Sequence, residues 1–430
     1  MAPTCNGLLA TLMVEGHRLG PLALMRAAAR SLRQNGSRAT LARVFGKLHQ
    51  ISAAHTVSTM LVADDDAAQV DWTTPGVNLT HPITVTEPRL ELAWIMSPPG
   101  RGSGGHQNLF RFIRFAEQAG HRCTIYLYTS SSVAPSIAEA QAVVAESSAY
   151  PTVAAKFVAY DRESGVAPDT HAILATGWET AYPSFLDHSH ARRFYFVQDF
   201  EPSFYSLGSE YVLAENTYRF GFLGITAGGW LAETLARDYG MATDKFDFAA
   251  DTTHYSVTNP EARSEVFFYA RPVTARRAFE FGILVLEEFA RLKPEVTINL
   301  AGWDLTGWNV PFAHVDHGSL DLEQLNGLYN RCAAGLVLSL SNMSLLPLEL
   351  IASGVVPVVN DGPNNRMVSD NPFIEYVPTS PGAMARRMVD VLERPDAAER
   401  VRAMPASLGT PDWSASGLQF LAALERGVRG

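Results

Sequence analysis

Short apolar runs alternate with amphipathic segments through most of this chain, and this order constrains its fold more than any other feature. Leu90–Met96 is apolar enough for a buried strand, residues 107–119 have the spacing of an amphipathic helix, and Cys123–Tyr128 is apolar again. Two strands separated by a helix are expected to run parallel, because a parallel connection needs a long crossover. The alternation therefore predicts an α/β fold built on parallel sheets.

The alternation forms two successive series. The first ends with a helix near 230–238, and the second starts at Val266–Ala270 and runs through an apolar strand at Val355–Val359. Two such series predict two doubly wound, Rossmann-like domains that face a cleft. The expected segments are a basic helical extension with a linker at 1–89, an N-terminal domain at 90–260, a C-terminal domain at 261–395, and a helix at 396–430 that packs back on the N-terminal domain.

Composition limits the classes of function open to the chain. Its 430 residues, 47% of them hydrophobic, can bury two cores, and a net charge of −10 argues against nucleic acid as a partner. Three scattered cysteines do not suit a disulfide framework or a zinc site, and they suit a reducing cytoplasm. No apolar run approaches the roughly 18 residues of a membrane span, and no secretory signal is evident. We therefore expect a cytoplasmic protein without a bound metal.

Positive charge is concentrated at the N-terminus, where the first fifty residues hold seven basic residues and one acid. Residues 8–50 have a helical pattern, so they could lie on an anionic membrane surface, or pack as helices on the first domain or on a partner. Asp64–Asp66 follow in a proline-bearing stretch. Their position predicts a solvated linker rather than a metal site.

The most informative polar residues of the second series lie between two apolar strands. Ser339–Leu345 forms a polar loop, and Glu349 stands on an otherwise apolar helical segment. A helix N-terminus at the carboxyl ends of parallel strands favours a diphosphate, and a nearby carboxylate can accept hydrogen bonds from sugar hydroxyls. A capped helix with an exposed glutamate is the alternative interpretation.

Three arginines follow the first strand of the second series: Arg271, Arg276 and Arg277. Guanidinium groups bind diphosphates and stabilise the charge that builds on a leaving phosphate. Solvated arginines at the start of a helix are the alternative. Because cations there oppose the helix dipole, a bound anion explains their position better.

A glycine-rich loop follows the first strand of the first series, where a doubly wound sheet binds its ligands. Gly104 and Gly105 allow backbone N–H groups to approach an anion or a sugar. The spacing matches neither a dinucleotide fingerprint nor a P-loop. A tight turn, with His106 capping the next helix, is the alternative.

Two further loops of the first series carry candidate site residues. Thr176, Trp178 and Tyr182 are candidates for a sugar platform, because sugar C–H faces pack on aromatic rings, although both aromatic residues could instead fill the core. Asp199 and Glu201 share a face if the chain stays extended, so either could act as a general base. Helix capping or surface ion pairs are the alternatives for these two acids.

These motifs together resemble the GT-B glycosyltransferases of retaining family 4, and within them the WsaF-type rhamnosyltransferases that use dTDP-rhamnose. The resemblance spans about residues 90–420. It is carried by 98–106, 175–182, 196–202, 224–230, 268–272 and 339–354 with Pro357.

The resemblance implies an N-terminal acceptor domain and a C-terminal nucleotide-sugar domain, and it assigns roles to residues of the second. Glu349 matches the second acid of a Glu-x7-Glu motif that grips the nucleotide ribose, whereas Ser341 stands where the family has the first acid. The remaining donor-site residues that it implies are Asn342 beside Ser341, the amides of Ser344 and Leu345 at the diphosphate, Gly318 and Leu320 at the base, and Gly104 and Gly105 near the phosphate. Arg271 matches a phosphate-facing arginine. Arg276 or Arg277 matches a phosphate-facing lysine, and the spacing favours Arg276.

The function implied is transfer of L-rhamnose from dTDP-β-L-rhamnose to a hydroxyl of a cell-surface polysaccharide or a lipid-linked glycan, with retention. The family needs no metal or other cofactor besides its nucleotide-sugar substrate. His106, Thr176, Trp178 and Tyr182 would contact the acceptor. Ser341 keeps open a degenerate, non-catalytic scaffold. A nicotinamide-dependent oxidoreductase is disfavoured, because its glycine fingerprint is missing.

Overall fold

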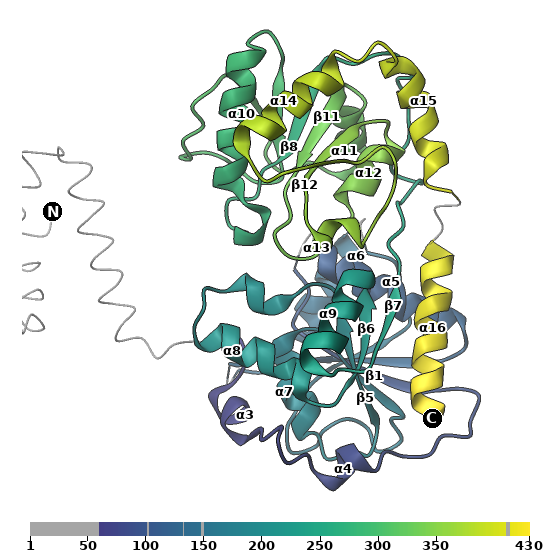
Figure 1. Ribbon diagram of the computed structural model, residues 1–430. Coiled ribbons are helices and arrows are strands. Elements are labelled where there is room, and N and C mark those ends of the chain that lie inside the picture. Colours follow the sequence, from purple (N-terminus) through teal and green to yellow (C-terminus); the bar gives the residue numbers. More distant parts are fainter. Residues whose placement is uncertain (1–59, 101–102, 132, 148–149, 410–412) are drawn as a thin grey trace, which may run out of the picture. The chain divides into compact units, whose positions relative to one another are not determined.

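The computed structural model describes residues 60–100, 103–131, 133–147, 150–409 and 413–430 (Figure 1). Residues 61–430 form one compact unit. The basic segment 8–50 lies outside the described residues, so its membrane contact stays a prediction.

The first domain is built on a seven-stranded parallel sheet with the order β3-β2-β1-β4-β5-β6-β7. Its strands are β1 (Glu91–Met96), β2 (Arg122–Leu127), β3 (Lys156–Ala159), β4 (Ala172–Ala175), β5 (Arg192–Val197), β6 (Leu223–Ala227) and β7 (Thr243–Phe246). The chain builds outward from β1 to β3 and then returns to place β4 on the other side of β1. This reversal is a topological switch point, where loops diverge and leave room for a ligand.

The second domain repeats the arrangement with six parallel strands in the order β10-β9-β8-β11-β12-β13. Its strands are β8 (Glu265–Tyr269), β9 (Ile298–Ala301), β10 (Val315–Asp316), β11 (Cys332–Val337), β12 (Val356–Asn360) and β13 (Glu375–Val377). The switch point lies between β8 and β11. The loops after these two strands carry the predicted arginines and the predicted diphosphate loop.

Helices cover the faces of both sheets, as parallel sheets require for burial. Those of the first domain are α5 (Gly104–Gln118), α6 (Ile137–Glu146), α7 (Trp178–Leu186), α8 (Ser209–Asn216) and α9 (Gly229–Tyr239). Those of the second are α10 (Phe279–Leu292), α11 (Leu322–Tyr329), α12 (Leu346–Ala352), α13 (Pro363–Arg366), α14 (Pro381–Leu392) and α15 (Ala397–Ser407). Short 3-10 turns lie at Glu201–Phe204, Thr217–Arg219 and Ala275–Arg277.

The last helix, α16 (Trp413–Arg429), runs beside the first sheet although it follows the second in sequence (Figure 1). Phe420 packs against Trp94 of β1 and Phe112 of α5, with ring centroids 5.8 and 5.2 Å apart. A side chain at Gly417 would meet the ring of Phe115 at 2.7 Å. Close packing therefore fixes α16 on the first domain.

The stretch before the first strand packs on the first domain. It holds α3 (Asp64–Gln69) and α4 (Val77–Thr80). Asp66 is 1% exposed, and its Oδ2 accepts a hydrogen bond from Tyr128 at 2.7 Å and pairs with Arg162 at 2.8 Å. The expectation of a solvated linker is therefore wrong for Asp66, because a tyrosine and an arginine compensate the loss of water around its carboxylate.

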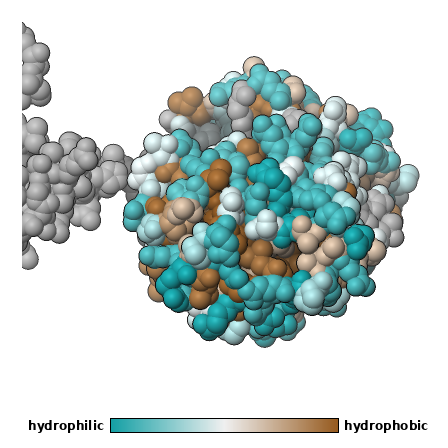
Figure 2. Space-filling model, turned by 90° about the horizontal axis from the view of Figure 1, so that it is seen from above, coloured by the Kyte–Doolittle hydropathy of each residue, from teal (hydrophilic) through white to brown (hydrophobic). Residues whose placement is uncertain are grey.

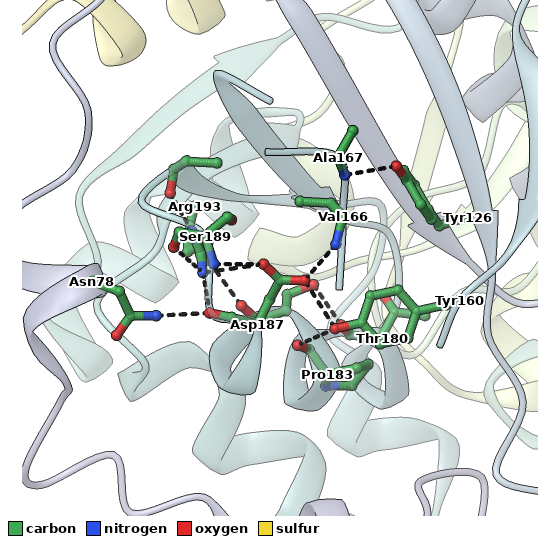
Figure 3. Close-up of polar contacts among 12 residues, drawn as sticks. Asn78, Tyr126, Tyr160, Val166, Ala167, Thr180, Pro183, Asp187, Ser189 and Arg193 are labelled. Carbon is green, nitrogen blue, oxygen red and sulfur yellow. Dashed lines mark hydrogen bonds and ion pairs between the residues drawn. The ribbon is translucent and has the colours of Figure 1, made fainter. Parts of the chain in front are cut away.

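A buried polar network ties α4 to the end of α7 (Figure 3). Arg193 donates to the backbone carbonyls of Ser184, Asp187, Ser189 and Ala191, and its Nη2 lies 3.8 Å from Asp187 Oδ1. Asn78 donates to the Asp187 carbonyl at 2.7 Å. These contacts join α4, the end of α7 and β5, so the network's role is to hold the fold.

Replacing Arg193 with alanine is expected to destabilise the protein by about 3 kcal/mol, because four backbone carbonyls lose a donor and the buried Asp187 carboxylate loses its cationic partner. The midpoint of thermal unfolding measures this loss. Arg237→Ala, which removes an exposed ion pair with Asp238, should change stability by less than about 1 kcal/mol. Equal midpoints for the two variants would contradict the structural role of Arg193.

The outer face of the second domain is largely hydrophilic, with hydrophobic patches between (Figure 2). The exposed hydrophobic side chains of this domain include Val273 and Leu284, at 55% and 52% exposure. Within the described residues, no helix combines the length and apolarity needed to cross a membrane.

Candidate functional site

The two domains meet where the loops after their strands face one another. A side chain at Gly228, which has a φ of +84° just before α9, would lie 3.3 Å from Val368 of the second domain. Only a glycine gives this left-handed backbone without strain and leaves room for Val368. The close approach of Gly228 and Val368 lets α9 pack against α13 and the segment after it (Figure 1).

A network of asparagines fixes the loop that follows β11. Ser339 donates its backbone N–H to Asn360 Oδ1 at 2.8 Å, and the Asn360 amide donates to the Ser339 carbonyl at 2.9 Å. Asn365 donates to the same carbonyl at 3.2 Å. These bonds fix the backbone of the loop that leads into the N-terminus of α12, as a site for an anion requires.

Three buried polar atoms around this loop have no hydrogen-bond partner within the described residues. They are Ser341 Oγ, Asn342 Oδ1 and Arg271 Nε. Ser341 and Asn342 are each 1% exposed. Because an unpaired buried polar atom costs about 1–3 kcal/mol, such atoms together indicate a place where a polar ligand binds.

The predicted arginines divide between two tasks. Arg271 donates to the Tyr269 hydroxyl at 3.0 Å and lies near the ring of Trp303, at 5.7 Å. Arg277 donates to Ser339 Oγ at 2.5 Å, and burial lowers its pKa. Arg276 turns toward the first domain. The preference for Arg276 over Arg277 at the diphosphate is therefore not supported, since Arg277 is the one that reaches the loop.

Asp199 joins the two domains. It is 7% exposed, its Oδ2 accepts from Arg276 Nε at 2.9 Å, and its Oδ1 accepts from the backbone N–H of Asn342 at 2.8 Å. The Asn342 side chain donates in turn to the carbonyls of Gln198 and Ala227, at 3.2 and 2.9 Å. Both carboxylate oxygens of Asp199 already accept hydrogen bonds from protein donors. The structure therefore does not support the prediction that Asp199 is a general base. Asp199 instead anchors the β11–α12 loop to the first domain.

Glu201 does not share the direction of Asp199, because the chain turns into a 3-10 helix at this residue. It is 5% exposed, and its Oε2 accepts from Trp178 N–H at 2.6 Å and Tyr195 O–H at 3.0 Å. Burial raises its pKa to about 8. The prediction that Glu201 is a catalytic base is therefore wrong, since its carboxylate faces the interior.

Glu349 lines a small pocket of about 20 Å³ that also includes Leu345 beside α12. No hydrogen-bond donor within the described residues reaches its carboxylate. Burial raises the pKa of Glu349 to about 7, nearby Arg111 lowers it, and Asp251 raises it. The pocket therefore offers a carboxylate with free acceptor capacity, and the alternative of a solvent-exposed glutamate does not hold.

Arg111 of α5 brings the first domain to this pocket. It lies 3.6 Å from Asp251 and 4.0 Å from the ring centroid of Trp413 in α16. Arg111 is not among the site residues predicted from the sequence, although an arginine between two phenylalanines of α5 is a signal. The pocket thus combines α5, α12, α16 and the connection between the domains.

Gly318 and Leu320 lead from β10 into α11, whose Leu322 lines the same pocket. Gly318 has a φ of +59°, and its carbonyl accepts from Gly302 at 2.7 Å. Ser344 and Leu345 lie just before α12, with both residues partly accessible. These four residues lie in the two loops that the resemblance places around the base and the diphosphate.

In the first domain, the glycine loop forms the N-terminus of α5. Gly104 and Gly105 are exposed, and Gln198 donates to the Gly105 carbonyl at 3.2 Å. His106 is held by Ser103 Oγ and the Ser97 carbonyl, at 3.0 and 3.1 Å, and burial lowers its pKa. Both glycine backbones are free to approach a ligand.

Trp178 and Tyr182 do not form a sugar platform. They are 1% and 2% exposed, Trp178 donates to the Tyr205 hydroxyl at 2.8 Å, and Tyr182 donates to the Leu213 carbonyl at 2.9 Å. Both rings fill the first domain's core, which was the alternative interpretation. Thr176 is half-buried, and its hydroxyl donates to the Ile95 carbonyl at 2.9 Å.

Known structures decide the fold. A sucrose-phosphate synthase from Thermosynechococcus elongatus aligns with a TM-score of 0.57 and 13% identity, covering 79% of this chain and 99% of that one. Anabaena Alr3699/HepE in complex with UDP and glucose aligns with a TM-score of 0.58 and 14% identity, covering 78% of this chain and 100% of that one. The fold is GT-B. The predicted α/β architecture is therefore confirmed.

Sequence comparisons agree with this fold. The family model of the WsaF N-terminal domain matches residues 146–226, and that of the WsaF C-terminal domain matches residues 264–389. The O-antigen biosynthesis protein RfbC of Myxococcus xanthus is 34% identical over 310 residues, which cover 69% of this chain. The matched part is only 24% of that protein, so the chain spans about a quarter of the relative's length.

Proposed function

We propose that the chain is a glycosyltransferase of polysaccharide biosynthesis, which moves a sugar from a nucleoside diphosphate to a glycan hydroxyl. One observation carries the proposal. Polar atoms of Ser341 and Arg271 that have no partner among the described residues lie at the switch point of the second sheet, and the carboxylate of Glu349 stands on the helix that follows. A phosphate, a donor sugar and a ribose are groups that such atoms bind.

The comparisons support this class of substrate. Anabaena Alr3699/HepE has the same fold and is described in complex with UDP-glucose. Both WsaF domain models match, and the RfbC relative is an O-antigen biosynthesis protein. We propose dTDP-β-L-rhamnose as the donor, because a serine stands at 341 in place of the family's acid and a deoxy-sugar needs fewer hydrogen bonds. We propose a polysaccharide or lipid-linked glycan as acceptor.

The reaction can proceed without a protein nucleophile. The acceptor oxygen forms a bond to the anomeric carbon, the bond from that carbon to the diphosphate breaks, and the electron pair stays on the departing phosphate. That phosphate takes the acceptor proton, and the sugar keeps its configuration. Arg271, Arg277 and the amides before α12 stabilise the charge on the leaving group. We propose that this scheme needs no divalent metal.

A donor-hydrolysis assay tests the proposal. The chain is incubated with dTDP-rhamnose, UDP-glucose and GDP-mannose, and release of the nucleoside diphosphate is measured. We expect release from dTDP-rhamnose above the rates for the other two donors. Tight dTDP binding without any release or transfer would favour the second candidate, a scaffold that has lost catalysis at Ser341.

The affinity for dTDP should rise with pH around neutrality. Because the pKa of Glu349 is raised to about 7, the carboxylate that accepts a hydrogen bond from the deoxyribose 3′-hydroxyl is largely protonated below pH 7 and ionised above it. The dissociation constant should therefore fall as pH rises through 7, and Glu349→Gln should remove this dependence. Calorimetric titrations on both sides of pH 7 measure the effect. An unchanged pH dependence in the variant would contradict the role of Glu349.

A further inference from the structure

A half-buried polar cluster lies at the switch point of the first sheet, between the ends of β1 and β4. It consists of Ser97, which follows β1, His106 on α5, and Thr176 and Glu179, which follow β4. We call it the Glu179 cluster. Switch points are where doubly wound sheets bind ligands. The proposed donor site lies at the corresponding point of the second sheet, which leaves this one for the other substrate.

Glu179 is held in a single position. Its Oε1 accepts a hydrogen bond from Ser97 Oγ at 2.6 Å. The carboxylate folds over Gly177 so closely that a Cβ at that glycine would lie 2.6 Å from Oε2. Within the described residues, Ser97 is the only side chain that donates to Glu179. The carboxylate also accepts a hydrogen bond from the backbone N–H of Glu179. Because an ionised carboxylate has about four acceptor positions, it keeps the capacity to accept a hydrogen bond from a ligand.

The neighbours of Glu179 orient the cluster. His106 contacts the Ser97 carbonyl at 3.1 Å, so α5 and β1 share one arrangement. Burial raises the pKa of the neighbouring Glu201, and the charge of Glu179 raises it further. Glu201 is fixed by its own donors, the Trp178 backbone N–H and the Tyr195 hydroxyl. Of the two acids, only Glu179 is partly accessible.

The Glu179 cluster lies near the proposed donor site. β4 pairs with β5, and Asp199 after β5 contacts Arg276 and the Asn342 N–H of the donor loop. Neighbouring strands are about 4.8 Å apart. The loops after β4 and β5 leave the same edge of the sheet, so the Glu179 cluster and the residue that touches the donor loop lie at neighbouring strand ends.

We propose that Glu179 accepts a hydrogen bond from a hydroxyl of the acceptor glycan, and that Ser97 and His106 complete a subsite for a neutral sugar unit. This inference rests on the proposed function and names the acceptor class of the same cleft. A carboxylate suits hydroxyl groups and repels a uronic acid at this position. Glu179 takes the place in the acceptor site that the buried Trp178 and Tyr182 cannot fill.

The test compares Glu179→Gln with Glu139→Gln, a matched change on the exposed start of α6. Transfer from dTDP-rhamnose is measured with methyl glycosides of neutral hexoses and 6-deoxyhexoses, and dTDP affinity by calorimetry. Loss of a charged hydrogen bond should raise the acceptor KM of Glu179→Gln at least ~10-fold, with dTDP affinity within about twofold of wild type. Glu139→Gln should behave as wild type.

A pH series separates contact with the substrate from a structural role. Burial raises the pKa of Glu179, so its ionised fraction grows with pH above the ordinary glutamate range. The wild-type acceptor KM should fall over that range, and the KM of Glu179→Gln should not. Ser97→Ala, which removes the bond to Oε1, should raise the acceptor KM less.

Three results would overturn the acceptor subsite. The acceptor KM could be unchanged in Glu179→Gln, or the variant could lose dTDP affinity by the same factor as its acceptor KM rises. The wild-type chain could also use none of these glycosides. In the last case, dTDP binding and donor hydrolysis would still stand and would preserve the proposed function. If dTDP fails to bind at all, the proposed function itself fails.

Discussion

Arg271→Ala is expected to slow sugar transfer at least ~10²-fold, comparable to the loss of one oxyanion donor in other enzymes. Arg271 follows β8 at the switch point, and its Nε is buried without a partner within the described residues. The guanidinium would bind the leaving diphosphate as charge builds on it. The measurement is kcat for transfer from dTDP-rhamnose at saturating donor.

Two further variants sharpen this prediction. Arg271→Lys keeps the charge but loses the planar fork, so it should recover only part of the rate. Arg237→Ala removes an exposed arginine of α9 and should leave the rate unchanged. Near-wild-type turnover in Arg271→Ala would rule out its role at the diphosphate.

Asp199→Ala is expected to lower kcat/KM for the donor about 30- to 100-fold. The change removes a nearly buried carboxylate from Arg276 and from the Asn342 N–H, and breaking such a pair costs several kcal/mol when it is fully buried. Since Arg276 is partly exposed, we expect a loss of kcat/KM nearer to about 30-fold than to about 100-fold. The β11–α12 loop would then lose its anchor on the first domain.

A double-mutant cycle with Arg276→Met distinguishes an anchor from a catalytic base. If Asp199 acts through Arg276, the double variant should lose little more activity than Asp199→Ala alone, because the two residues form one unit. Fully additive losses would contradict the anchor. They would restore the interpretation of Asp199 as a base acting directly on the acceptor.

The order of apolar runs was sufficient to predict both sheets, because parallel strands buried on two faces leave continuous apolar segments. The same reasoning located the β11–α12 loop, since ligands follow the carboxyl ends of strands. It did not distinguish core aromatics from exposed ones. Trp178 and Tyr182 lie beside polar residues in sequence, yet helix α7 turns both rings inward.

Contacts between residues distant in sequence explain the remaining errors. Asp199 meets Arg276 and Asn342 only when the two domains face each other, and no local pattern encodes that pairing. Arg276 and Arg277 are adjacent, so spacing alone could not decide which of them reaches Ser339. Glu179 followed a strand end like the selected residues, but its contact with Ser97 depends on β1 and β4 being neighbours.

Calorimetric titration of dTDP into the wild-type chain and into Glu349→Ala tests the central claim most directly. A donor site between the β11–α12 loop and Glu349 predicts saturable binding at one site per chain. It also predicts at least ~10-fold weaker binding in the variant, because a charged hydrogen-bond acceptor for the deoxyribose 3′-hydroxyl is lost. Absence of dTDP binding by the wild-type chain, or equal affinity in the two proteins, would contradict it.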